Sequence, residues 1–196
     1  MRTVTGLFDS YDDAHRAVSE LETAGVPSSD ISIVSHAGDR DRDGDDSLAA
    51  EGAGTGAGIG AVAGGTGGLL AGLGIMAIPG VGPVVAAGWL AATAAGAVAG
   101  AIAGGAAGGL VGAMMRAGVP EEDAHVYAEG VRRGGTMVVA KVDEGQVAVA
   151  EDILQRANRV DIDARRTAYR QAGWERFDES AEPLDDLEAE RARWRR

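Results

Sequence analysis

The chain of 196 residues contains no cysteine, which excludes disulfide bonds and thiolate chemistry and leaves no sign of a redox compartment. Aromatic residues make up only 4% of it, so we expect a core of alanine, valine, leucine and isoleucine. Its 18 basic residues are outnumbered by 30 acidic ones, which gives a net charge of -12. This balance argues against nucleic acid as a partner and against electrostatic attraction to anionic lipid. The first residues begin a strand-like pattern at once, so we expect no signal peptide.

Charged residues are also absent from residues 52–115, where glycine recurs at every fourth position on both sides of a break at residues 79–83. Residues four apart lie nearly above one another on a helix, so a row of glycines allows two backbones to approach closely. This is the small-xxx-small pattern of membrane helix pairs. We predict two glycine-zipper helices, over residues 54–77 and 84–115, joined as a hairpin at Pro79 and Pro83. The predicted helix-packing interface consists of Gly52, Gly56, Gly60, Gly64, Gly68, Gly72, Gly88, Gly96, Gly100, Gly104, Gly108 and Gly112.

The glycine row also predicts self-association. Each step of four residues advances about 40° beyond a full turn, so the row winds around its helix. A winding row cannot face a single neighbour along its whole length. We therefore expect several hairpins to pack side by side in a homo-oligomer.

The apolar hairpin favours a location in or on the cell membrane. Its helices would be about 36–48 Å long, enough for a hydrocarbon core of about 30 Å. Arg116, Arg132 and Arg133 flank its base, so the positive-inside tendency places the rest of the chain in the cytoplasm. The alternative is a soluble cytoplasmic assembly (a ring, shell or filament) in which hairpins bury one another. A flexible linker is disfavoured by the many leucines and valines, and the G-x-G-x-x-A match at Gly58 lacks a preceding strand.

The segment before the hairpin has a strand–helix–strand pattern. Strands are predicted over residues 2–8 and 31–35, with a helix between them that has Ser10 as its N-cap. Gly25 fits the position just after the helix end. The acidic linker that follows, residues 38–51, matches the start of a calcium loop but has Ala50 where the loop needs glutamate, so we interpret it as a solvated linker.

The segment after the hairpin repeats helix and strand twice. We predict a helix from Pro120 to the Gly134-Gly135 pair, a strand over residues 136–142, a helix ending near Ala157 and a last strand over residues 160–164. The fold class is therefore α+β, a ferredoxin-like βαββαβ domain with the glycine-zipper hairpin inserted between the second and third strands. The predicted segments are 1–37, 38–51, 52–115, 116–166 and 167–196, the last being a charged tail.

No catalytic, metal or cofactor site emerges from the residue pattern. His15, His36 and His125 lack metal-ligand spacing, and no serine has a recognisable nucleophile setting. The acidic run at residues 121–123 reads as charge at a helix N-terminus. We expect a protein that is not an enzyme. In the tail we expect a helix over residues 184–196. We expect its aromatic side chains to pack on the domain first, with a neighbouring subunit and then a membrane interface as the alternatives. These aromatics are Trp174, Phe177 and Trp194.

Several motifs resemble the general stress protein 17M-like, or heat-induced stress protein, domain family of bacteria. The N-terminal signature is matched by Val4-Thr5-Gly6-Leu7-Phe8-Asp9, by the helix Asp13–Gly25 with Val26-Pro27, and by Ile31-Ser32-Ile33-Val34. The glycine-zipper middle, Gly134-Gly135-Thr136-Met137-Val138-Val139 and Gly173-Trp174-Glu175-Arg176-Phe177-Asp178 resemble uncharacterised relatives of that family. The resemblance implies induction under stress, with no assigned catalytic residue and no assigned cofactor.

Three function classes follow. The first is a non-enzymatic stress-related protein that self-associates through its hairpin in or on the membrane and displays ferredoxin-like domains on the cytoplasmic side. The second is a soluble structural assembly that uses the same zipper. The third is a ligand-sensing domain, for which the sequence marks no pocket.

Overall fold

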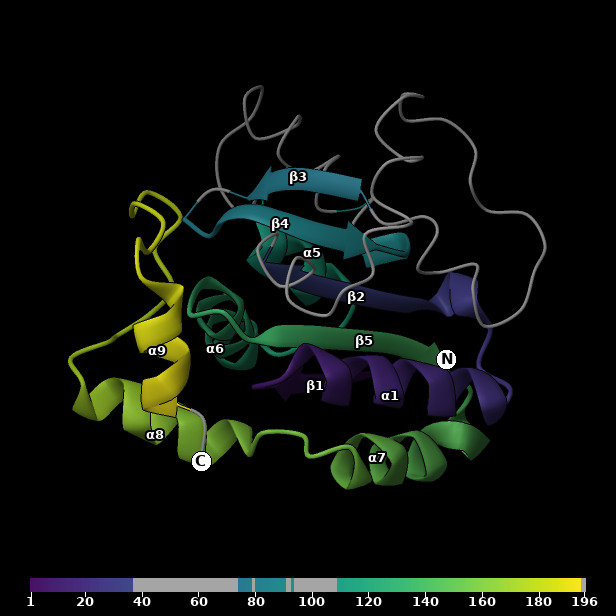
Figure 1. The fold of residues 1–196 in the computed structure, drawn as a ribbon. Coiled ribbons are helices and arrows are strands. Elements are labelled where there is room, and N and C mark those ends of the chain that lie inside the picture. The colour runs from purple at the N-terminus through teal and green to yellow at the C-terminus, as the bar shows by residue number, and fades with distance from the viewer. Residues whose placement is uncertain (37–73, 79, 91–92, 94–108, 195–196) are drawn as a thin grey trace.

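The computed structural model describes residues 1–36, 74–78, 80–90, 93 and 109–194, with the backbone alone for residues 74–76 (Figure 1). Its described part is an α+β structure, which confirms the α+β class predicted from the sequence. The glycine-rich residues between these ranges, and the acidic linker before them, lie outside the described part of the chain.

In the described part of the chain, five strands form one sheet in the order β1-β5-β2-β4-β3, and every neighbouring pair is antiparallel (Figure 1). The strands are β1 (Arg2–Phe8), β2 (Ile31–His36), β3 (Gly74–Ile78), β4 (Gly82–Ala87) and β5 (Thr136–Val142). Because β5 pairs antiparallel with both β1 and β2, those two strands run parallel to each other. They form a split βαβ unit with helix α1 (Tyr11–Thr23), which is the order that a ferredoxin-like plan requires for its first three strands.

Local sequence explains the first half of this unit. Four small or branched apolar residues of α1 are buried at helical spacing, as predicted: Ala14, Ala17, Val18 and Leu21. Gly25 has a φ of 91°, and the Val26 N–H donates to the Leu21 carbonyl at 3.0 Å, the arrangement of a Schellman helix end. A short 3-10 helix (Ser28–Asp30) then leads into β2.

Both faces of the sheet are covered, so its strands bury alternate side chains on opposite sides. Helices α1 and α7 (Val147–Arg156) cover the face that carries Phe8, Ile33 and Val138. Helices α5 (Gly109–Arg116) and α6 (Glu121–Arg132) cover the face that carries Leu7, Val34 and Met137. The described chain therefore has three layers with an apolar cluster on each side of the sheet. A 3-10 helix (Glu144–Gln146) precedes α7.

The predicted helix–helix hairpin at the prolines is wrong for the residues that the structure describes. Residues 74–77 and 84–87 are strands, and they form a β-hairpin in which Ile78 pairs with Gly82. Gly80 and Gly82 turn the chain with φ values of 74° and 98°. β4 also pairs with β2, from Ile33 opposite Ala87 to His36 opposite Val84. The branched and small side chains of β4 suit a strand as well as a helix. Pairing with the free edge of β2 favours the strand.

Gly88 marks where this hairpin joins the sheet. Its φ is 89°, and a Cβ there would lie 2.2 Å from the Ile31 carbonyl oxygen. The glycine therefore permits a close approach of two backbones at the end of a strand, whereas the sequence predicted it in a helix-packing row.

The predicted fourth ferredoxin-like strand is also wrong. Residues 162–164 begin helix α8 (Ile162–Gln171), because the Asp161 carboxylate accepts hydrogen bonds from the backbone N–H groups of Asp163 and Ala164, each at 3.0 Å. What remains of the expected pairing with β1 is one bond, from the Val160 N–H to the Leu7 carbonyl at 2.8 Å. The tail helix expected near the C-terminus is present as α9 (Leu187–Trp194).

Candidate functional site

The predicted glycine interface lies mostly outside the described residues, where ten of its twelve glycines fall. Gly88 ends β4, and Gly112 is buried in α5. Within the described residues the structure therefore does not bring the glycine row together as one surface. The ten glycines outside the described residues are Gly52, Gly56, Gly60, Gly64, Gly68, Gly72, Gly96, Gly100, Gly104 and Gly108.

The three histidines lie apart. His15 and His125 are partly exposed on helices, as predicted, and His125 Nε2 lies 3.8 Å from a Glu121 carboxylate oxygen. His36 is the last residue of β2 and is buried, with Nε2 3.2 Å from the Val81 carbonyl oxygen. Burial lowers the pKa of His36, while the hydrogen bond to Val81 opposes that shift. Within the described chain, no group of three acidic or histidine side chains is arranged to hold a metal ion.

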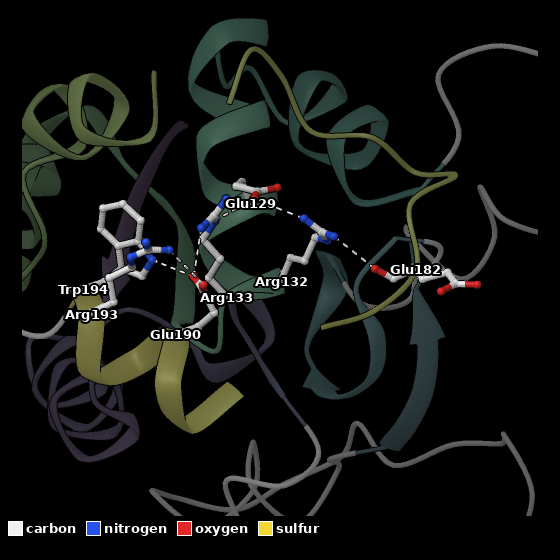
Figure 2. Close-up of polar contacts among 7 residues, drawn as sticks. All are labelled: Glu129, Arg132, Arg133, Glu182, Glu190, Arg193 and Trp194. Atoms are coloured by element: carbon white, nitrogen blue, oxygen red, sulfur yellow. Dashed lines mark hydrogen bonds and ion pairs between the residues drawn. The ribbon is translucent and has the colours of Figure 1, made fainter. Parts of the chain in front are cut away.

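The most distinctive polar feature is a carboxylate buried in the apolar layer. Glu129 of α6 is 1% exposed. Its Oε1 accepts from Arg133 Nε at 2.6 Å and from Arg132 at 3.3 Å, one turn further along the same helix (Figure 2). A buried carboxylate without partners would cost several kcal/mol, and these two guanidinium groups supply the hydrogen bonds and opposite charge that offset this cost.

Helix α9 completes this charge cluster. Arg133 lies between Glu129 and Glu190, whose Oε2 it contacts at 2.9 Å (Figure 2). The Trp194 indole N–H donates to the same Glu190 oxygen at 2.8 Å. Arg191 Nε donates to the Gly134 carbonyl at 2.9 Å. The C-terminal helix is therefore attached to the end of α6 by a chain of alternating charges.

Helix α8 adds a second ion pair and an aromatic cluster. Arg165 donates to the Asp9 carboxylate at 2.7 Å, which connects α8 to the end of β1. Tyr169 is fully buried, and the rings of Trp174 and Trp194 meet it edge-on at centroid distances of 5.7 and 4.8 Å. Burial raises the pKa of Tyr169 to about 12, although the charges of Arg165 and Arg133 oppose the shift. The phenol therefore stays neutral at physiological pH.

A cavity of about 10 Å³ lies among Asp9, Arg133, Arg165, Tyr169 and Trp194, with glycines at the end of α6 forming its floor. Such a volume holds about one water molecule and excludes an organic substrate. Because its carboxylates are already shared between guanidinium groups, the arrangement fastens elements together. We call this cluster of Glu129, Arg133, Arg165, Tyr169, Glu190 and Trp194 the sealed end of the domain.

The segment between α8 and α9 packs over the β3–β4 hairpin (Figure 1). Phe177 is 3% exposed and belongs to the core on this face. A Cβ on Gly80 would lie 2.5 Å from the Asp178 carbonyl oxygen, and Pro183 packs on Gly82. The expectation that the tail aromatics pack on the domain is confirmed. Glu129 was not among the residues predicted from the sequence. Its available signal is an acid among apolar positions, followed by arginines three and four residues later.

Residues 3–77 match the heat induced stress protein YflT domain. The YflT match covers β1, α1 and β2 and ends inside β3, so the resemblance inferred from the opening motifs is confirmed for that part. No curated protein and no solved structure matches the chain. Across the described residues, no helix is both long enough and apolar enough to cross a membrane.

Proposed function

We propose that this stress-related protein is not an enzyme and acts by associating with copies of itself through its uncharged glycine-rich segments, residues 52–72 and 94–108. The observation that carries the proposal is the glycine at every fourth residue in a stretch of the sequence without charge. Such rows let backbones pack closely only when another surface covers them. The net charge of -12 disfavours nucleic acid as a partner.

The folded domain limits how these segments can reach a partner. Residues 37–73 connect β2 to β3, and both strands belong to one sheet. A chain that starts and ends on the same side of a bilayer must cross it an even number of times, and two helical crossings need about 40 apolar residues. The acidic run at residues 39–46 leaves fewer than that. This geometry favours assembly in the cytoplasm over a membrane-spanning hairpin.

A second form of the proposal keeps the bilayer as a partner. Leu69, Leu70 and Leu73 lie at the C-terminal end of the first glycine-rich segment, and their side chains suit contact with an apolar surface. In this form the glycine-rich segments lie against the cell membrane, and the α+β domain stays on the cytoplasmic side.

The deciding experiment replaces Gly64 and Gly104 by leucine in the full chain and measures particle size by sedimentation. We expect wild-type oligomers to dissociate, because the added side chains separate packed backbones. Gly145→Leu is the matched control, since a Cβ at Gly145 meets nothing within 4 Å and adds the same side chain outside the glycine rows. Unchanged oligomers in the double variant, or a monomeric wild type, would refute self-association through these segments.

Flotation on a lipid gradient separates the two forms. Protein that stays at the bottom as regular particles supports assembly in solution. Protein that floats with vesicles supports the bilayer-bound form.

A further inference from the structure

The other end of the sheet carries basic side chains that have no acidic partner among the described residues. A pocket of about 310 Å³ opens beside the start of β1 and the end of β5, the end near the N-terminus in Figure 1. Arg2, Arg116 and Lys141 line it together with Trp89, Thr3 and Thr93. Its size is at the lower end of the range for small-molecule sites. We call it the basic pocket.

The charge of the basic pocket is unusual for this chain. Acidic residues outnumber basic ones by 30 to 18, and Lys141 is the only lysine of the sequence. Within the described ranges, no carboxylate lines the pocket or forms an ion pair with Arg2, Arg116 or Lys141. Arg116 is in the last turn of α5, where the helix dipole favours a cation. The dipole does not explain the other two, so like charges gather here without compensation from the fold.

The fold holds these groups in fixed positions. Thr3 and Lys141 are directly opposite each other in the β1–β5 pairing, which places their side chains on one face of the sheet. The Thr3 hydroxyl donates to the Ala117 carbonyl at 2.5 Å and so ties the end of α5 to β1. Arg116 and Lys141 are thereby brought to the same opening from a helix and a strand.

Trp89 forms the aromatic wall of the pocket. It follows Gly88, whose close approach to β2 orients the chain, and its indole N–H donates to the Asp30 carbonyl at 3.0 Å. Lys141 Nζ lies 3.6 Å from the centre of the Trp89 ring. The wall is thus fixed before any ligand arrives, which lowers the entropy cost of binding.

We propose that the basic pocket binds a small phosphate monoester, with Arg2, Arg116 and Lys141 neutralising the dianion and Trp89 contacting the uncharged part. Guanidinium groups match phosphate oxygens through paired N–H donors, and a lysine adds a compact positive charge. The phosphate could belong to a free metabolite or to a lipid headgroup, and both present the same chemistry to these side chains. The proposal is independent of self-association.

The single lysine provides the measurement. Full-length protein labelled with lysine carrying ¹³C at Cε alone gives one labelled side-chain signal, that of Lys141. Adenosine monophosphate should shift this signal to saturation, inorganic phosphate should shift it more weakly, and adenosine should leave it in place. Vesicles containing phosphatidic acid, compared with phosphatidylcholine vesicles, test the lipid source. A response to phosphatidic acid alone assigns the ligand to a lipid headgroup, and a response to adenosine monophosphate alone assigns it to a free metabolite.

Variants then test the pocket itself. Arg116→Gln should weaken binding by about tenfold, the loss expected for one charge-assisted contact. Arg170→Gln is the matched control, because it removes the same charge from an exposed position of α8 outside the pocket. Its affinity should equal that of the wild type. The proposal fails if none of the phosphate probes gives a saturable shift, or if Arg170→Gln weakens binding as much as Arg116→Gln.

Discussion

The two ends of the α5–α6 face use the same residue types in opposite ways. At the sealed end, Arg132, Arg133 and Arg165 are matched by carboxylates or carbonyls, and the remaining cavity is about 10 Å³. In the basic pocket, Arg116 and Lys141 line about 310 Å³ with no carboxylate among the described lining residues. Paired charges are part of the folded structure, whereas charges left without a counterion are available to a ligand.

The largest effect on stability is expected at Glu129 of the sealed end. Glu129→Ala leaves two guanidinium groups without their buried partner, so we expect a loss of about 3–5 kcal/mol in the free energy of unfolding. Denaturant unfolding measures it. Glu122→Ala, at an exposed position of the same helix, should change stability by no more than about 0.5 kcal/mol. Equal effects of the two variants would show that the buried cluster does not hold the domain together.

Gly134 and Gly118 test how closely the chain is packed at the sealed end and near the basic pocket. Gly134 follows α6 with a φ of 88°, and Gly118 follows α5 with a φ of 92°. A Cβ on Gly134 would lie 2.5 Å from Arg191 Nε, whereas one on Gly118 meets nothing within 4 Å. Gly118→Ala should cost about 1–2 kcal/mol from backbone conformation alone, and Gly134→Ala should cost more because Arg191 must also move. Identical unfolding free energies would mean that α9 is not held at this contact.

His36, which contacts the β3–β4 turn, should make the stability of the fold depend on pH. Its pKa lies below the ordinary value of 6.5 in the folded protein, because burial disfavours the charged form and Arg191 repels it. The unfolded chain therefore binds more protons as the pH falls through 6.5, and stability declines on acidification. His36→Gln keeps a donor for the Val81 carbonyl and should reduce the loss between pH 7.5 and 5.5. A variant with the wild-type pH profile would contradict this assignment.

The smallest effect on stability is expected in the basic pocket. Arg116 is exposed and pairs with no carboxylate among the described residues, so Arg116→Gln should shift the free energy of unfolding by less than about 0.5 kcal/mol. Thermal unfolding checks this. Together with the expected loss of phosphate binding, it would separate a ligand-binding cation from a structural one. A destabilisation comparable to that of Glu129→Ala would place Arg116 in the structural class.

Elements whose side-chain pattern and end signals lie within one short stretch of sequence were predicted correctly. The apolar stripe of α1 and its glycine end predicted that helix correctly, and the alternating run at residues 136–142 predicted β5. These elements bury one face, and their spacing states which face it is. The strand predicted over residues 160–164 was wrong, because Asp161 caps a helix. This local hydrogen bonding outweighed the alternating pattern of Val160 and Ile162.

The sequence by itself determined the split βαβ frame, the α+β class and the relationship of residues 3–77 to the YflT domain. The strands over residues 74–78 and 82–87 depend on the tertiary structure, since their branched and small side chains suit either conformation and pairing with the open edge of β2 favours the strand. The tertiary structure also decided which arginines are paired. Asp9 and Glu190, which pair with Arg165 and Arg133, lie 156 and 57 residues away along the chain, and the basic pocket is lined from β1, α5, β5 and the segment after β4. Spacing along the chain records neither kind of contact, because electrostatic pairing depends on distance in space.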